Sequence, residues 1–228
     1  MSVIKISNLT KIYNKTQVPV HAVNGINLTF EEGEFVAIVG PSGCGKTTFM
    51  NMIGGLEEPT SGSVEINETN ISALTSNQRI NFRLQNIGFI FQSYNLIPVL
   101  TSKENVAFIM QLQNKPKNEI EQRTIQLLQS VGLGNKINSK PNQMSGGEQQ
   151  RVAVARALAS KPKFVLADEP TANLDSKATT QLLDIMKKLN EEENMTFIFT
   201  THDQRVVDKA RRIITLEDGK VISDQIIS

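Results

Sequence analysis

The sequence of 228 residues is poor in the features that mark secreted, membrane-spanning or nucleic-acid-binding proteins. It has one cysteine and no tryptophan, so no disulfide framework is available and a reducing compartment is favoured. The formal net charge of +1 implies no bulk electrostatic attraction to nucleic acid. No apolar run approaches the roughly 20 residues that a membrane span needs, and residues 1–6 show no signal-peptide pattern. We therefore expect no nucleic-acid partner, and any membrane has to be supplied by another chain.

The most specific pattern present is G-x-x-x-x-G-K-[ST], the P-loop that cradles nucleotide phosphates. It consists of Gly40, Pro41, Ser42, Gly43, Cys44, Gly45, Lys46 and Thr47, and Thr48 follows it. An apolar run at residues 35–39 predicts a strand before it, and residues 48–53 predict a helix after it. Glycines let backbone amides turn inward as an anion nest at a helix start. Lys46 is predicted to reach the β- and γ-phosphates, and the Thr47 hydroxyl to ligate Mg²⁺. Average residue frequencies give a chance match a probability of roughly 1%.

The rest of the chain predicts an α/β protein built around this P-loop core. Alternating residues at 3–13 and 18–30 predict an antiparallel β subdomain, and residues 101–131 predict inserted helices. The length and the ordinary composition, 39% apolar and 21% charged, suit one domain over residues 1–228. Within it we assign residues 1–91 and 163–228 to the β subdomain and core. About 92–162 form the helical subdomain.

Acidic and polar side chains stand where predicted core strands end. Asp168 and Glu169 follow the apolar residues 164–167, and ligands bind at such carboxyl ends. Asp168 is predicted to hold Mg²⁺ through water, and Glu169 to polarise an attacking water. A solvated acidic loop is the alternative, which the buried run and the following proline disfavour. His202 and Gln92 also follow strands, although either residue taken alone is more often an ordinary loop residue.

A second anion site is predicted about a hundred residues after the first. Ser145, Gly146 and Gly147 precede Glu148 at a helix start, and Ser145 with Glu148 forms a capping-box pattern. A plain helix cap is the alternative. One nucleotide needs only one such nest, so a second nest on the same chain is explained if it serves a neighbouring copy. Tyr13, at a strand end, is a candidate to stack on a base, although edge packing is its commoner role.

In this order the motifs resemble those of the nucleotide-binding subunits of ATP-binding-cassette (ABC) transporters, over essentially the whole chain. Residues 40–47 resemble Walker A, residues 164–169 Walker B with its catalytic glutamate, and residues 144–148 the LSGGQ signature. Gln92 resembles the Q-loop, Asp175 belongs to a D-loop-like stretch at 172–175, His202 resembles the switch histidine, and Tyr13 the aromatic that stacks on adenine. Two positions depart from the signature. Met144 replaces leucine at similar volume, and Glu148 replaces glutamine, which places a charge at the helix start.

The resemblance implies an ATPase that uses ATP and Mg²⁺, with Glu169 and His202 as catalytic residues and Thr47, Gln92 and Asp168 around the metal. It further implies a homodimer in which residues 145–148 contact the ATP of the partner copy. Residues 87–98 are most similar to the lipoprotein-releasing and macrolide-exporter (LolD/MacB) branch, with FtsE-type cell-division ATPases as near neighbours. That branch implies a separate permease of the MacB/LolC/FtsX type, with the cassette peripheral on the cytoplasmic face of the cell membrane. Gln92 and residues 93–98, with Tyr94 and Leu96 among them, are then expected to line the groove that receives a cytoplasmic helix of the permease.

Other P-loop classes fit less well. A GTPase should show N-K-x-D, which is absent, and a small-molecule kinase would not explain residues 145–151. A non-transport ABC protein acting on DNA or ribosomes is the serious alternative. The DNA-repair type needs a long coiled coil between P-loop and signature, for which there is no room, and the ribosomal type carries two cassettes.

Overall fold

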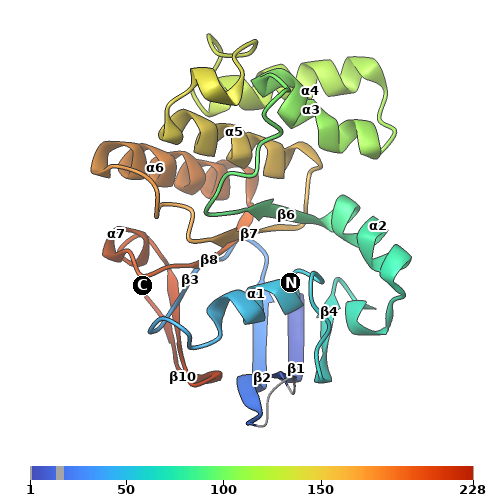
Figure 1. Cartoon of the computed structure of the whole chain (residues 1–228), viewed down its shortest axis with the longest axis vertical. Helices are drawn as coiled ribbons and strands as arrows, with labels where there is room; N and C mark the ends of the chain where they lie inside the picture. Colours follow the sequence, from blue (N-terminus) through green and yellow to red (C-terminus); the bar gives the residue numbers. More distant parts are fainter. Residues whose placement is uncertain (1, 14–17, 228) are drawn as a thin grey trace.

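The computed structural model describes residues 2–13 and 18–227. Residue 1 of the N-terminal segment 1–6 therefore lies outside the described residues. Two sheets and a group of helices make up the molecule (Figure 1). The strands are β1 Ser2–Tyr13, β2 Val20–Glu31, β3 Phe35–Val39, β4 Ser61–Ile66, β5 Thr69–Asn70, β6 Ile87–Ile90, β7 Phe164–Asp168, β8 Thr196–Thr200, β9 Arg212–Glu217 and β10 Lys220–Ile226. The helices are α1 Lys46–Ile53, α2 Ser76–Asn86, α3 Ser102–Leu112, α4 Lys117–Ser130, α5 Gly146–Ala159, α6 Ser176–Glu193 and α7 Gln204–Val207, with 3₁₀ turns at Ile71–Ala73 and Pro141–Gln143.

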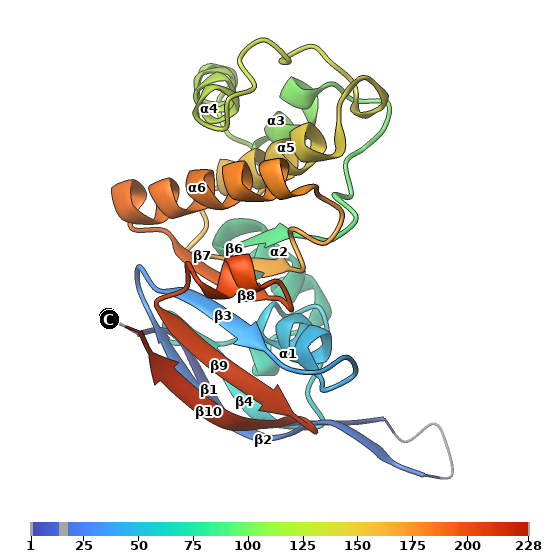
Figure 2. The same cartoon turned by 90° about the vertical axis from the view of Figure 1, so that its left-hand side faces the viewer.

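The first sheet is antiparallel, in the order β2-β1-β4-β5, as the alternating N-terminal sequence predicts. One face of β1 is buried through Ile4, Ile6 and Leu9, while polar residues between them face outward. Figure 2 shows the ends of β1 and β2 projecting beyond the body of the molecule.

The second sheet carries the functional residues at one edge. Its order is β10-β9-β3-β8-β7-β6, and all neighbouring pairs are parallel except β9 with β10. Because parallel strands end at the same edge, the carboxyl ends of β3, β7 and β8 meet there. The P-loop, the acidic pair and the histidine are thus brought together from segments far apart in the sequence.

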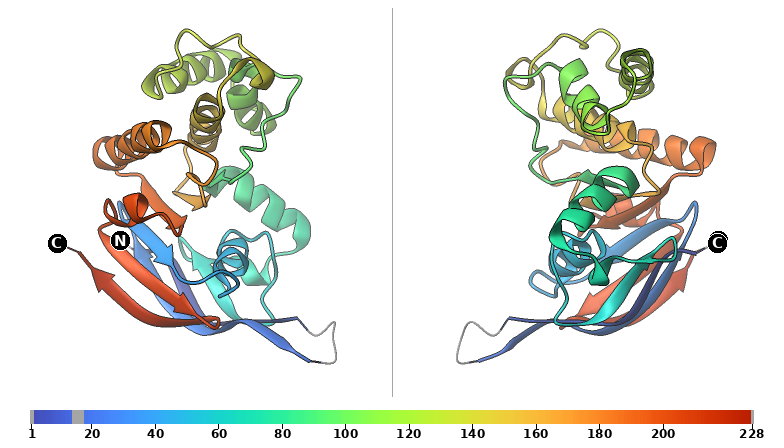
Figure 3. Two further views of the ribbon diagram at one scale, coloured as in Figure 1. Left: turned by 60° about the vertical axis from the view of Figure 1, so that its left-hand side comes forward. Right: turned by 90° about the vertical axis from the view of Figure 1, so that its right-hand side faces the viewer.

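Each face of this sheet covers a separate hydrophobic core. Phe164 and Leu166 of β7 face a core shared with α1 and the first sheet, whereas Val165 and Ala167 face a core shared with α3, α4, α5 and α6. Figure 3 shows the helices α3, α4 and α5 at one end of the molecule and the first sheet at the other. The α/β fold with an antiparallel β part and inserted helices matches the prediction.

Several element boundaries differ from the sequence prediction. The strand expected at residues 18–30 runs from Val20 to Glu31, whereas α5 begins at Gly146 behind its N-cap Ser145, as the predicted capping box requires. The helical stretch at 101–131 is divided into α3 and α4 around Pro116. None of the helices among residues 2–13 and 18–227 is long and apolar enough to cross a bilayer.

Candidate functional site

A cavity of about 650 Å³ lies at the carboxyl edge of the parallel sheet. It brings together predicted residues from the P-loop, the Q-loop position and the ends of β7 and β8. These lining residues are Ser42, Gly43, Gly45, Lys46, Thr47, Thr48, Gln92, Glu169 and His202. Sequence reasoning missed the remaining part of the lining, which comes from β2 and the β9–β10 turn: Val20, His21, Ala22, Asp218 and Gly219.

The shape of the P-loop depends on glycine at Gly45. This residue has φ +102°, and a Cβ there would lie 2.0 Å from the Ala22 carbonyl oxygen. Helix α1 begins at the next residue, so its first amides open into the cavity, as an anion nest requires. The Lys46 ammonium donates to the carbonyls of Gly40 and Pro41, at 2.8 and 3.0 Å. The cavity therefore combines oriented amides with a cation, the two groups that phosphate binding needs.

Asp168 lies just behind the cavity, at the end of β7. The Thr47 hydroxyl is 3.5 and 3.4 Å from its two carboxylate oxygens, and the Thr200 hydroxyl donates to one of them. Two neighbouring segments thus hold the Asp168 carboxylate beside the residue predicted to ligate Mg²⁺.

Glu169 and His202 form the polar end of the cavity. One carboxylate oxygen of Glu169 lies 2.9 Å from His202 Nδ1, and the other, Oε2, is buried without a hydrogen-bond partner in the described part of the chain. The Glu169 side chain is 18% exposed, whereas that of His202 is 74% exposed. An unpartnered buried carboxylate oxygen is costly, so this site favours a ligand such as water or a metal-bound water.

These donors fit a magnesium ion that also binds phosphate oxygens. Among the described residues no group of three or more His, Cys, Asp or Glu could hold a metal by itself. Mg²⁺ needs no such group, because it commonly uses one or two carboxylates together with substrate phosphates and waters. Thr47 lies beside Asp168 and shares the cavity lining with Gln92, and metal binding by these three residues remains a prediction.

Five residues predicted to contact nucleotide lie outside the cavity lining, namely Tyr13, Gly40, Pro41, Cys44 and Asp168. The Tyr13 hydroxyl donates to Glu57 Oε1 at 2.6 Å, and burial together with this bond raises the pKa of the phenol. Cys44 is 5% exposed and its side chain packs into the core beneath the loop, where the thiol sulfur lies 3.8 Å from Lys46 Nζ. Base stacking by Tyr13 remains a prediction. A side-chain role for Cys44 is disfavoured.

The signature residues lie at the start of α5, away from the cavity lining. Ser145 Oγ accepts from the Glu148 amide at 3.3 Å, and Glu148 accepts from the Ser145 amide at 2.8 Å. The pKa of the Glu148 carboxyl is lowered, mainly by the hydrogen bond from the Ser145 amide. Lys136 lies 3.5 Å from the same carboxylate. The capping box is confirmed, and the charge that Glu148 introduces is locally balanced. Asp175 likewise caps α6 by accepting from the Ala178 amide at 2.8 Å.

A chain of contacts connects the Q-loop segment to the signature. The Asn173 side chain donates to the Gln92 carbonyl at 2.9 Å, and the Tyr94 hydroxyl is 3.5 Å from the Asn173 carbonyl. A Cβ at Gly146 would lie 2.7 Å from that hydroxyl. Asn173, a residue of the D-loop-like stretch at 172–175, therefore stands between the cavity and the start of α5.

Comparison with known proteins identifies the family. Residues 23–172 match the ABC transporter family. The chain belongs to this family. The ABC transporter ATP-binding protein MJ1508 of Methanocaldococcus jannaschii is 47% identical, over 96% of this chain and 97% of that protein. The fold is also that of a solved ABC cassette, the dimeric MJ0796 in a post-hydrolysis state bound to ADP and Pi. The two structures superpose with a TM-score of 0.90, and their sequences are 42% identical over 99% of each chain. The predicted role, an ATP-binding and ATP-hydrolysing subunit of an ABC transporter, is thereby confirmed.

A longer relative is also similar. The macrolide export ATP-binding/permease protein MacB of Aggregatibacter actinomycetemcomitans is 44% identical over 98% of this chain. The match spans 35% of that protein, whose name includes a permease.

Proposed function

We propose that this ABC ATPase hydrolyses ATP with Glu169 as the base and His202 as the residue that orients it. The observation that carries this is the unpartnered Glu169 Oε2 at the end of a cavity lined by the P-loop. That oxygen accepts a proton from the attacking water as the water approaches the terminal phosphate. The 2.9 Å contact to His202 fixes the carboxylate, and Lys46 with the α1 amides stabilises charge on the phosphate oxygens. Thr47, Gln92 and, through water, Asp168 would hold Mg²⁺, which would neutralise phosphate charge.

We further propose that two copies share each ATP in a head-to-tail C2 dimer. The Ser145 hydroxyl uses an acceptor lone pair in the capping box, and its own O–H stays available as a donor. Together with the amides of α5 it forms an anion site that lies outside the cavity of its own chain. The related cassette MJ0796 has been solved as a dimer. ATP between the P-loop of one chain and the signature of the other joins them, and hydrolysis releases them.

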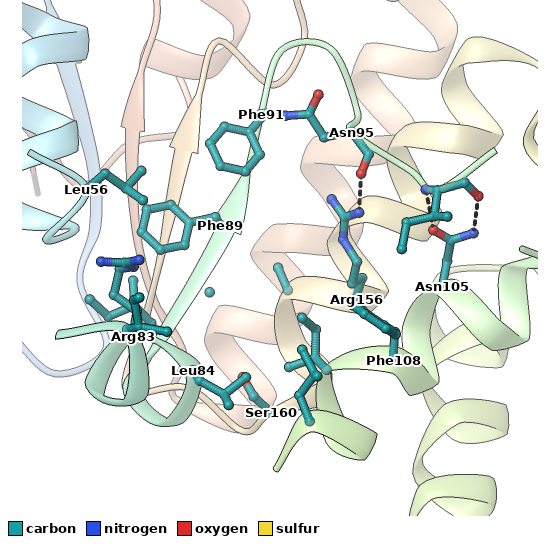
Figure 4. A pocket seen from close by; sticks show the side chains of 17 residues that line it. Leu56, Arg83, Leu84, Phe89, Phe91, Asn95, Asn105, Phe108, Arg156 and Ser160 are labelled. Atoms are coloured by element: carbon teal, nitrogen blue, oxygen red, sulfur yellow. Dashed lines mark hydrogen bonds between the residues drawn. The ribbon is translucent and has the colours of Figure 1, made fainter. Parts of the chain in front are cut away.

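A groove of about 390 Å³ is the proposed contact with a membrane permease. It lies between α2, β6, α3 and α5, and Figure 4 shows its side chains. Leu56, Ile80, Phe108 and Leu112 are between 36% and 51% exposed along it, and clustered exposed apolar side chains mark a protein interface.

Of the residues 93–98 expected to line the permease groove, Tyr94 and Leu96 do not line this cavity. Leu96 packs against the core of the helical part, and Tyr94 is directed to Asn173 and the start of α5. Of this segment, Phe91, Asn95 and Ile97 line the groove instead. Left-handed backbone at both Tyr94 and Asn95 turns the chain there, and the expectation took no account of this turn.

We assign the permease to the MacB/LolC/FtsX type, with the cassette on the cytoplasmic face of the cell membrane. Similarity to MacB supports this. Overall identity does not separate branches, because the methionine import protein MetN 1 of Bacillus thuringiensis is 41% identical. The assignment therefore rests on residues 87–98, and FtsE-type ATPases remain the alternative within it.

The dimer is tested with Glu169→Gln, which should bind Mg-ATP, hydrolyse it at least about a hundredfold more slowly and stay dimeric. Adding Ser145→Arg should abolish that dimer, because a bulky cation fills the site for the terminal phosphate. Ser130→Arg, at an exposed serine of α4, is the matched control and should leave the dimer intact. Size-exclusion chromatography with light scattering measures all three. A monomeric Glu169→Gln protein in saturating Mg-ATP, or a dimer indifferent to Ser145→Arg, contradicts the shared site.

A further inference from the structure

Two guanidinium groups lie on opposite sides of the apolar groove. Figure 4 shows Arg83 beside Leu56 and Phe89, and Arg156 beside Asn95 and Phe108. Among residues 2–13 and 18–227, both cations bond only to backbone carbonyls. Arg83 Nη1 donates to the Gly55 carbonyl at 2.7 Å, and Arg156 donates to the carbonyls of Tyr94 and Asn95. Within the described part of the chain no carboxylate lies within 4.0 Å of either group.

Two acidic residues that line a neighbouring pocket together with Arg83 pair with other cations. Glu58 pairs with Arg79 at 2.7 Å, and Glu57 pairs with Lys11 at 3.0 Å. Arg79 lies one helical turn before Arg83, so it adds like charge. Burial and this neighbouring charge lower the pKa of the Arg83 guanidinium. The groove thus holds a positive charge that its own chain leaves uncompensated.

Arg83 is better placed than Arg156 to bind a partner. Arg156 gives both of its terminal nitrogens to carbonyls, which fixes the turn at Tyr94 and Asn95. In Arg83 only Nη1 is bonded to a described residue, so Nη2 and Nε remain as donors in a geometry that matches a carboxylate.

We propose that the segment seated in this groove is an amphipathic permease helix whose carboxylate side chain pairs with Arg83. The inference rests on the proposed docking of a permease and names the chemistry of its contact. Apolar residues of that helix cover Leu56, Ile80, Phe108 and Leu112, which removes water from around Arg83. Desolvating an unpaired guanidinium is unfavourable, so the helix that docks best is one that brings a compensating acid. Arg83 thereby selects among permeases by charge.

The experiment uses the complex of the tagged chain with the permease that co-purifies from detergent-solubilised membranes of its own cells. After reconstitution into vesicles of neutral phosphatidylcholine, the ratio of permease-stimulated to basal ATPase rate is measured. Arg83→Glu should lower this ratio at least about tenfold, and Arg83→Lys should lower it less. Lys117→Glu, at an exposed cation of α4, is the matched charge reversal and should leave the ratio unchanged. Changing each acidic residue in the cytoplasmic loops of the permease to arginine should identify one position that restores the ratio with Arg83→Glu.

An unchanged ratio in Arg83→Glu, or no restoring position in the permease, overturns the proposal. An effect of Arg83→Glu that appears only when anionic phosphatidylglycerol is added identifies a lipid headgroup as the ligand, and also overturns it. Ile80→Asp tests the groove itself, since Ile80 is 51% exposed and tolerates a polar residue. If Ile80→Asp keeps full stimulation, or if no permease co-purifies, the proposed docking fails as well. Loss of stimulation in Ile80→Asp but not in Arg83→Glu refutes only the acidic contact.

Discussion

At the scale of single residues, the backbone conformation of Glu169 explains why its two carboxylate oxygens lie in different surroundings. Its φ of +47° is left-handed, which is unusual for a residue other than glycine and costs about 1–3 kcal/mol. Its amide donates to the Thr200 carbonyl at 3.0 Å, so the adjacent strand holds it there. This conformation directs one oxygen to His202 and buries the other. The cost is consistent with a position kept for chemistry rather than for stability.

A pH effect is expected from Asp203, the residue after His202. Its pKa is lowered, mainly by the hydrogen bond from Arg205, and it also accepts from Thr171 at 3.1 Å. A lowered folded-state pKa means that the contribution to stability is complete above the unfolded value near ~3.9 and is lost as pH falls through the folded value. Urea denaturation at pH 5.5 and pH 3 should therefore show a smaller acid-induced loss for Asp203→Asn than for the unchanged protein. Equal losses would show that the carboxylate has no such role.

At the scale of elements, the junction between the P-loop and α1 can be tested at one glycine. Gly45→Ala forces a methyl group to 2.0 Å from the Ala22 carbonyl, in addition to backbone strain. Binding of a fluorescent ATP analogue should weaken at least about tenfold. Stability should fall by more than the roughly 1–2 kcal/mol that a left-handed backbone alone costs. Gly132→Ala is the control, since Gly132 has φ +73° and nothing within 4 Å of its Cβ position. Gly132→Ala should lose only the stability that a left-handed backbone costs, and it should bind the ATP analogue normally. Equal stability loss and equal binding in the two variants would contradict the clash with the Ala22 carbonyl as the cause.

Local elements were largely predictable from the sequence because their signals are local. The capping box at Ser145 and Glu148 and the strand before the P-loop appear as expected, and the Asp-Gly pair at 218–219, a hairpin signal between apolar runs, forms the turn between β9 and β10. The position of that turn was not predictable. The Gly219 amide donates to the Cys44 carbonyl at 3.1 Å, a contact between segments distant in sequence that no periodicity encodes. The hydrogen bonds from Arg156 to the carbonyls of residues 94 and 95 likewise join distant segments and could not be predicted from the sequence. The site roles of the motif residues remain predictions that the variants above test.

At the scale of the whole molecule, the separation of the P-loop cavity from the signature predicts a dependence on protein concentration. If each ATP needs two chains, the ATPase rate per chain should rise with concentration until the dimer is saturated. Phosphate release measured over a dilution series in excess Mg-ATP reports this directly. The Ser130→Arg control should show the same rise, and Ser145→Arg should show none. A rate per chain that stays constant on dilution would indicate that one chain hydrolyses ATP alone.

The order of the parallel sheet also determines when a newly made chain becomes able to bind nucleotide. Phe35 of β3 pairs with Phe197 of β8, and Val36 of β3 pairs with Arg212 of β9. The ribosome therefore releases the P-loop long before either neighbour of its strand exists, and such long-range parallel pairings form slowly. Until residues 196–219 emerge, the buried face of β3 is exposed to chaperones and to aggregation. A chain interrupted before residue 212 would contain the complete P-loop sequence and still lack the cavity.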